Sequence, residues 1–215
     1  MEYEKAKRLA ADPAADVRRS LAARAGLAPE ILFYLAEDKS ADVRRTVAEN
    51  PATPRQADLL LTKDAEVSVR ERLAGKIGAL LPDLAGEDKE KIRELTNQVI
   101  EALARDQAVR VRQIVAEALK DAVDAPPAVI QKLARDIEIK VAGPVLEHSP
   151  LLSDEDLLEI IANHPIKGAL TAIAKRRALA GKVSDAVVKI AAADPQESAT
   201  VKKLLENGSA QIRED

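Results

Sequence analysis

Apolar and polar positions alternate along this chain with a helical period, and that pattern itself repeats. The segments LAADPAADVRRSLAARAGLAPEILFY (residues 9–34) and LAEDKSADVRRTVAENPATPRQADLL (35–60) align without a gap. Related starts follow at 61, 103, 133, 161 and 191, at intervals of 26, 26, 42, 30, 28 and 30 residues. Apolar residues stand eight and twelve positions after most starts, as Val17 and Leu21 do in the first unit. Residues four apart share one helix face, so each unit predicts an amphipathic helix.

The residue three positions after each start predicts where these helices begin. Aspartate is a favoured N-cap residue because its carboxylate accepts a hydrogen bond from an unpaired backbone N–H. The position holds Asp12, Asp38, Asp64, Asp106, Asp136, His164 and Asp194. A shorter first helix is predicted to start near Pro29, Pro54, Pro127 and Ser153, with breaks at Gly26, Asn50–Pro51 and Gly75. Each unit is therefore a helical hairpin, and stacked hairpins bury faces that one hairpin would expose.

The one long interval contains GKIGALLPDLAGED, where Gly, Pro and Asp indicate a loop. This insertion near residues 75–88 leaves two organisations open. It forms a hinge between residues 1–86 and 87–215, or it holds an extra turn within one continuous stack.

An arginine six residues after the capping aspartate gives the units a D-x-x-x-x-V-R motif. This motif resembles the second-helix signature of HEAT repeats, and the resemblance implies an all-α, right-handed α-solenoid of about seven degenerate hairpins. It also implies an Asp–Arg ladder between neighbouring units. Six residues turn a helix through about 240°, so the arginine is expected to pair with the aspartate or backbone of a neighbouring unit. The ladder residues are Asp12, Arg18, Asp38, Arg44, Asp64, Arg70, Asp106 and Arg112.

The last three units lack the ladder arginine, because Ala142, Leu170 and Thr200 stand in its place. This asymmetry predicts an N-terminal part joined by the ladder and a C-terminal part packed by apolar contact.

Two further resemblances concern particular stretches. The first two units, with their NPATP turn, are similar to leucine-rich variant repeats, although no cysteine is present to hold that family's iron–sulfur cluster. Residues 133–161 and 170–188 are similar to an uncharacterised bacterial family, domain of unknown function 2336. That family implies the fold and no activity.

Composition narrows the functional classes. Hydrophobic residues make up 47% of the chain, but only Tyr3, Phe33 and Tyr34 are aromatic, so the core must be aliphatic. The 33 basic and 36 acidic residues give a formal charge of −3, which offers no support for nucleic-acid binding. No apolar run approaches the roughly 20 residues that cross a bilayer. A soluble, cytoplasmic protein is expected.

Catalytic motifs are missing from the sequence. It contains no G-x-S-x-G, P-loop, G-x-G-x-x-G or H-E-x-x-H pattern, and no cysteine. Its two histidines are interpreted structurally: His164 substitutes for the capping aspartate, and His148 ends a helix where positive charge suits the dipole. We therefore expect no enzymatic activity, no cofactor and no metal site.

The second arginine of the VRR motif is the stronger candidate for binding. Arg19 and Arg45 lie about 100° round the helix from the ladder arginines and recur on successive second helices, which line the concave face of HEAT-like arrays. A second basic cluster comprises Lys175, Arg176 and Arg177, with Lys182 nearby. It either complements a helix C-terminus or binds phosphate or an acidic partner.

These features favour a non-enzymatic protein-binding scaffold or adaptor, because solenoids offer extended concave surfaces. The alternative is a nucleic-acid-binding module shaped like the HEAT-like DNA glycosylases. Such a module needs a basic stripe and aromatic surfaces, whereas Glu71 interrupts the stripe here and aromatic residues are few. Nucleic acid and membrane partners are therefore not expected.

Overall fold

The computed structural model describes residues 2–80, 90–163, 166–193, 198 and 201–202. Within these ranges the chain is all-α, with thirteen helices. The chain divides into two compact units, Met1–Val115 and Ala116–Asp215. None of the described helices is long and apolar enough to span a membrane.

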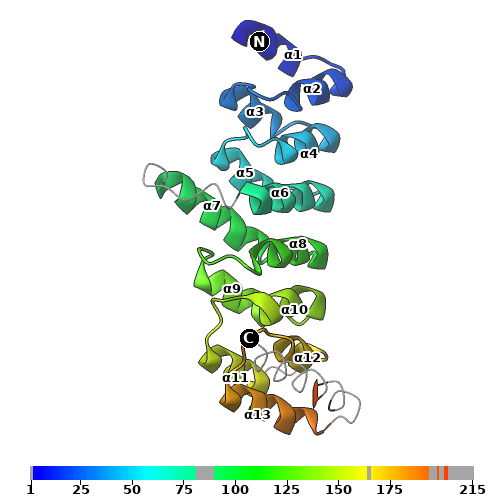
Figure 1. Ribbon diagram of the computed structural model, residues 1–215. Coiled ribbons are helices and arrows are strands. Elements are labelled where there is room, and N and C mark those ends of the chain that lie inside the picture. The colour runs from blue at the N-terminus through cyan, green and yellow to red at the C-terminus, as the bar shows by residue number, and fades with distance from the viewer. Residues whose placement is uncertain (1, 81–89, 164–165, 194–197, 199–200, 203–215) are drawn as a thin grey trace. The chain divides into compact units, whose positions relative to one another are not determined.

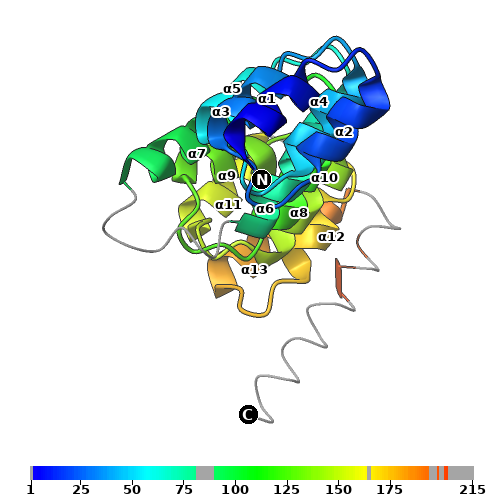
Figure 2. The ribbon, with the colours of Figure 1, turned by 90° about the horizontal axis from the view of Figure 1, so that it is seen from above.

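Unit 1 (Met1–Val115) is built from paired helices. They are α1 (Tyr3–Ala10), α2 (Ala15–Ala22), α3 (Pro29–Leu35), α4 (Ala41–Glu49), α5 (Arg55–Leu61), α6 (Val67–Leu80), α7 (Glu90–Leu103) and the start of α8 (Val109–Leu119). From α1 to α7, helices contact their next neighbour and the next but one. This pattern places α1, α3, α5 and α7 in one layer and α2, α4 and α6 in the other (Figures 1 and 2).

The core of unit 1 lies between these two layers and is aliphatic. The positions eight and twelve residues after each repeat start face inward in α4 and α6. Val43 and Val47 of α4 and Val69 and Leu73 of α6 are all fully buried. The amphipathic pattern of the sequence therefore identifies the face of each helix that packs into the core, as expected for helices with a 3.6-residue period.

Unit 2 (Ala116–Asp215) is also built from packed helices. It contains the end of α8, then α9 (Pro127–Ala134), α10 (Ile139–His148), α11 (Asp154–Asn163), α12 (Ala169–Ala174) and α13 (Gly181–Ala191). Helix α10 packs on α9 and α12, and α11 packs on α12 and α13. Helix α12 follows Gly168, which adopts a left-handed backbone conformation with φ of 91°. A side chain at Gly168 would crowd Ile139 as well as strain that backbone.

The predicted helix break at Gly75 is wrong, because Gly75 lies inside α6. A helix interior tolerates glycine at a cost of about 1 kcal/mol. Its neighbours Leu73, Ala74 and Ile77 are buried, and their packing outweighs that cost. The other two predicted breaks do separate helices, at Gly26 and at Asn50–Pro51.

Several expectations fall on residues outside the described ranges. Most of the insertion near residues 75–88 belongs to them, since residues 81–89 are not described. The same holds for His164, Asp194 and Thr200. The division at 86/87 and the hinge stay predictions.

The ladder and the candidate binding surface

The turns before α2, α4, α6, α8 and α10 are each shaped by an aspartate. The Asp12 carboxylate accepts a hydrogen bond from the Ala14 N–H at 2.8 Å. Asp38, Asp64, Asp106 and Asp136 accept the N–H two residues later in the same way. The predicted N-cap role is therefore wrong in position, because the helices begin three residues after the aspartate and Ala14 or Ser40 occupies the cap. The aspartates instead fold the chain into an Asx turn.

Arginine side chains join these turns into an Asp–Arg ladder, which we define as Arg18–Asp38, Arg44–Asp64 and Arg70–Asp106. Each guanidinium binds its carboxylate through two nitrogens. The Nε–Oδ2 distances are 2.6, 2.6 and 2.5 Å, and the Nη2–Oδ1 distances are 2.9, 2.9 and 3.0 Å. Such fork-like pairing is stronger and more directional than a single hydrogen bond. Each contact joins one repeat to the next within unit 1.

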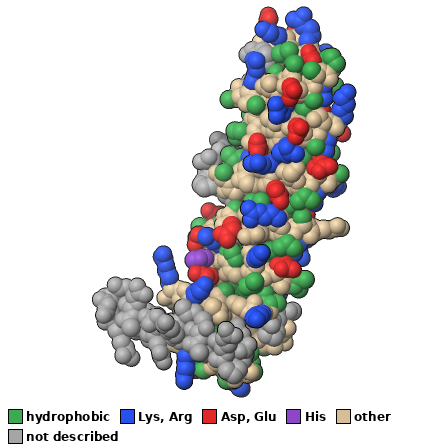
Figure 3. Space-filling view, turned by 90° about the vertical axis from the view of Figure 1, so that its right-hand side faces the viewer, with side chains coloured by type: hydrophobic (Ala, Val, Ile, Leu, Met, Phe, Trp, Pro, Cys, Tyr) green, Lys and Arg blue, Asp and Glu red, His purple; other side chains and the backbone are tan. Residues whose placement is uncertain are grey.

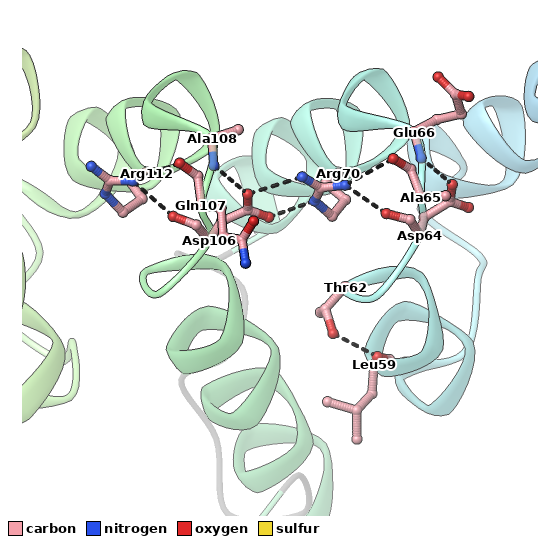
Figure 4. Close-up of polar contacts among 10 residues, drawn as sticks. All are labelled: Leu59, Thr62, Asp64, Ala65, Glu66, Arg70, Asp106, Gln107, Ala108 and Arg112. Atoms are coloured by element: carbon pink, nitrogen blue, oxygen red, sulfur yellow. Dashed lines mark hydrogen bonds and ion pairs between the residues drawn. The ribbon is translucent and has the colours of Figure 1, made fainter.

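The third guanidinium nitrogen binds the turn of the arginine's own repeat. The Nη1 atom of Arg18 donates to the Asp12 carbonyl at 2.7 Å, and Arg70 and Arg112 repeat the contact with the Asp64 and Asp106 carbonyls. Figure 4 shows Arg70 between the Asp64 turn and the Asp106 carboxylate. Helical rotation does not exclude this bond, because the aspartate lies outside the helix that carries the arginine.

The ladder alters the acid–base properties of its residues. The Arg18 hydrogen bond holds the pKa of Asp38 below its ordinary value. Burial alone would raise the pKa of Asp64, but the hydrogen bond from Arg44 and the Glu66 N–H together lower it. The pKa of Arg44 is raised by its hydrogen bond to Asp64. The carboxylates of Asp38 and Asp64 therefore stay ionised at lower pH than free aspartates do, and the ladder arginines have a structural role.

The candidate arginines Arg19 and Arg45 lie beside the ladder on α2 and α4. Their side chains are 52% and 35% exposed. Each pairs with an aspartate three residues earlier on its own helix, at 3.0 Å for Asp16 and 2.8 Å for Asp42. Exposed pairs of this kind contribute about 0.3–0.5 kcal/mol. The Arg45 Nε also donates to the Ser68 hydroxyl of α6 at 3.3 Å, so the Arg19 guanidinium is held more loosely than that of Arg45.

Charges of both signs are interspersed on the face of the molecule drawn in Figure 3. Arg72 of α6 pairs with Glu49 of α4 at 3.0 Å. At the position equivalent to Arg19 and Arg45, α6 carries the half-buried Glu71. A phosphate backbone would meet carboxylates along with the arginines on this surface.

A second row of contacts uses the residue fifteen positions after three of the repeat starts, at 35, 61 and 161. Asn50 donates to the Ala22 carbonyl at 2.6 Å and to the Arg24 carbonyl at 3.1 Å. Lys76 donates to the Asn50 carbonyl at 3.4 Å. In unit 2, Arg176 donates to the Leu146 and Ser149 carbonyls, both at 2.8 Å. We call Asn50, Lys76 and Arg176 the carbonyl row, because each satisfies unpaired carbonyls at the end of the preceding even-numbered helix.

The four basic residues of the cluster predicted from the sequence, at 175–177 and 182, have different roles in the structure. Arg176 belongs to the carbonyl row and is half-buried, and burial lowers its pKa. Lys182 lies against Glu155 at 2.8 Å and Asp154 at 3.5 Å. Lys175 approaches Glu147 at 3.7 Å, and Arg177 is exposed. The four cations do not converge on one anion site.

A buried ionic cluster in unit 1 escaped the sequence analysis. The Asp58 side chain of α5 is fully buried, and its carboxylate accepts hydrogen bonds from Lys76 and Arg55. Burial lowers the pKa of Lys76, and the Nε atom of Arg55 is buried without a partner. The repeat alignment held the signal, because Asp58 stands where the previous unit has the core residue Leu32. A carboxylate at a core position requires a buried cation.

No arrangement suited to metal binding occurs in the described ranges, where no three His, Cys, Asp or Glu side chains converge. His148 ends α10, as its sequence position suggested, and lies 3.4 Å from Glu147.

Comparison with curated proteins gives no match. A family match is confined to the C-terminal part of the chain, where the sequence resemblance was most specific. Residues 141–215 match the family described as "Uncharacterised protein conserved in bacteria (DUF2336)".

Proposed function

We propose that this protein is a non-enzymatic protein-binding scaffold or adaptor, built as a right-handed solenoid of about seven HEAT-like hairpins. The partner would lie on the concave face formed by the even-numbered helices. The packing of α1 to α7 on next and next-but-one neighbours supports this proposal, because repeats stacked in this way present equivalent positions side by side.

The observation that carries the proposal is the recurrence of Arg19 and Arg45 at one position of successive helices. The neighbouring Arg18 and Arg44 are fixed in the ladder. The second arginine of each pair has a partly exposed guanidinium that pairs with a surface aspartate, and Arg45 also donates to the Ser68 hydroxyl. Arginine is enriched at protein interfaces because its planar fork binds carboxylates in two-point fashion. An acidic protein segment could exchange with Asp16 and Asp42 at little cost.

The exposed aromatic residues lie on α1 and α3, in the layer of odd-numbered helices, where they offer a protein partner a contact surface separate from the concave face. Tyr3, Phe33 and Tyr34 are 49%, 41% and 60% exposed, although the core of unit 1 is aliphatic. Tyr34 and Leu60 hold equivalent positions on α3 and α5, which pack on each other, and Leu60 is 38% exposed. Exposed tyrosine and phenylalanine are characteristic of protein interfaces.

The proposal is tested by affinity capture with the full-length chain as bait, followed by identification of bound proteins. We expect a specific protein whose recovery falls at least about tenfold with Arg19→Glu/Arg45→Glu. The matched control is Lys63→Glu/Arg105→Glu, which reverses two exposed charges outside this surface and should keep the partner.

Two results would contradict the proposal. Retention of the partner by the Arg19→Glu/Arg45→Glu variant would mean that the surface is wrongly assigned. Binding of duplex DNA in a gel-shift assay that weakens steeply from low to physiological salt would favour the nucleic-acid-binding alternative.

A further inference from the structure

Helix α10 of unit 2 contains the two residue types that a helix interior tolerates least. Gly143 and Pro144 stand side by side in its middle, where glycine loses the most backbone freedom and proline removes a hydrogen-bond donor. The helix stays folded because Val141, Ala142 and Val145 are fully buried in the core. Packing therefore offsets the cost of the pair but does not account for it.

The local structure does not require glycine at position 143. A Cβ atom there would meet only the Ile139 side chain, at an ordinary contact distance of 3.7 Å. Gly143 also lacks the positive φ that Gly168 adopts, so alanine would fit and would favour the helix. Residues that disfavour their own helix are expected at functional sites, where space or shape outweighs local stability. What the glycine provides here is open space on the outer side of α10.

That space is a hollow of about 440 Å³ between the end of α8, α10 and α12, which we call the Gly143 hollow. Its apolar half is lined by Ile139, Gly143, Pro144 and Ala172. Its charged half lies at the last turns of the helices and is lined by Glu117, Lys120, Glu147, His148 and Lys175. The volume lies in the range of sites that hold a ligand group, and apolar contacts beside polar ones are the anatomy of protein interfaces.

The charged half of the hollow offers hydrogen-bond donors to an incoming oxygen ligand. Glu147 Oε1 lies 3.4 Å from His148 Nε2, and Glu147 Oε2 lies 3.7 Å from Lys175 Nζ. Lys120 pairs with Glu117 at 3.2 Å. An ammonium has three donors and no acceptor, and each of these pairs uses one of them. A carboxylate that enters the hollow therefore meets two lysines, which are 32% and 46% exposed.

The position of Gly143 in its repeat connects the hollow to the proposed partner surface. Gly143 stands ten residues after its repeat start, as Arg19 and Arg45 do in unit 1. We propose that the Gly143 hollow anchors a large apolar side chain of the partner's bound segment, beside an acidic residue that binds Lys120 or Lys175. This inference rests on the proposed protein-binding role and deepens it, because it assigns a chemistry to the segment that binds.

The test uses a capped pentapeptide with phenylalanine between two pairs of acidic residues, titrated into the full-length chain labelled with ¹⁵N. We expect saturable shifts of the Gly143 and Gly168 amide signals in the NMR spectrum. A peptide with alanine in place of phenylalanine should bind at least about tenfold more weakly, because the apolar anchor is lost. A peptide with lysine in place of the acidic residues should also bind at least about tenfold more weakly.

Gly143→Leu fills the hollow and should abolish the peptide-induced shift of Gly168. The thermal midpoint of this variant should equal or exceed that of the wild type, since leucine favours a helix interior more than glycine does. Gly75→Leu is the matched control, because Gly75 also lies inside a helix and a Cβ atom there meets nothing within 4 Å. This control should bind the peptide as the wild type does.

Several outcomes would overturn the proposal. No shift of either glycine at millimolar peptide, a shift of Gly168 that survives Gly143→Leu, or equal binding of the lysine-containing peptide would each do so. Phenylacetate carries the same ring and a carboxylate without a peptide backbone, and binding as tight as that of the peptide would overturn the proposal in favour of a small carboxylate ligand.

The hollow and the surface of Arg19 and Arg45 can fail separately. Arg19→Glu/Arg45→Glu leaves the hollow unchanged and should bind the pentapeptide as the wild type does. If the captured partner is lost with Arg19→Glu/Arg45→Glu but is fully retained by Gly143→Leu, the hollow is not its anchor, and the proposed function stands.

Discussion

Unit 1 and unit 2 join their repeats by different means. Unit 1 connects successive turns with the Asp–Arg ladder and encloses the Asp58–Lys76–Arg55 cluster. In unit 2 the ladder positions of α10 and α12 hold Ala142 and Leu170, which are buried among aliphatic side chains. The comparison shows that a repeat stack can replace a charged contact by an apolar one at the same position, because each position is shielded by its neighbours.

The carbonyl row is common to both units. Asn50 and Lys76 in unit 1 and Arg176 in unit 2 use different side chains for one task, the binding of helix-end carbonyls. Carbonyls at a helix end need donors whatever packs nearby. Both partners of an ion pair, by contrast, can be lost together without leaving an unpaired charge. This difference explains why Arg176, after α12, makes the carbonyl contact although α10 and α12 carry no ladder arginine.

The largest change in the free energy of unfolding is expected for a substitution in the buried Asp58–Lys76–Arg55 cluster of unit 1. Asp58→Asn removes the carboxylate that faces both Lys76 and Arg55 and leaves the buried Lys76 and the partly buried Arg55 without a counter-charge. We expect a loss of about 3–5 kcal/mol in the free energy of unfolding, measured by urea denaturation. Asp42→Asn is the matched control, because Asp42 also pairs with an arginine three residues away but is 61% exposed. Equal effects of the two changes would contradict the burial argument.

A smaller and pH-dependent effect is expected in the ladder. Arg44→Gln leaves the nearly buried Asp64 carboxylate without its guanidinium, at a cost of about 1.5–3 kcal/mol near pH 7. The folded-state pKa of Asp64 lies below its unfolded value. The pair therefore contributes fully above the unfolded pKa of about 3.9, and the contribution disappears as pH falls through the folded pKa. Urea denaturation at stepped pH values should show the difference between variant and wild type shrinking below about pH 4. A difference that stays constant to pH 2 would show that the ion pair is not its source.

The carbonyl row of unit 2 should give the smallest and least pH-sensitive effect. Arg176→Met keeps the length of the side chain but removes both donors to the Leu146 and Ser149 carbonyls, at a cost of about 1–3 kcal/mol. Carbonyls do not titrate, so this loss should be the same at pH 7 and pH 4. Arg177→Met, an exposed neighbour, should change the free energy of unfolding by less than about 0.5 kcal/mol. A loss with Arg176→Met that fades in acid would point to a carboxylate partner instead.

The sequence by itself determined the features that depend on local period. Residues four apart share a helix face in any context, so the core pairs Val43–Val47 and Val69–Leu73 could be placed from spacing alone. The absence of the ladder arginine from α10 and α12 was equally visible, since a repeat alignment compares equivalent positions directly.

Only the tertiary structure decided which side chains meet across repeats. The Asx turns, the helical Gly75 and the carbonyl contacts of Arg176 depend on neighbours packed from elsewhere in the chain. Asp58 and Lys76 lie 18 residues apart, so of the two partners of the misplaced carboxylate the sequence offered only Arg55, three residues earlier. Burial supplies the reason, because a charge excluded from water must find its counter-charge wherever the fold brings one within reach.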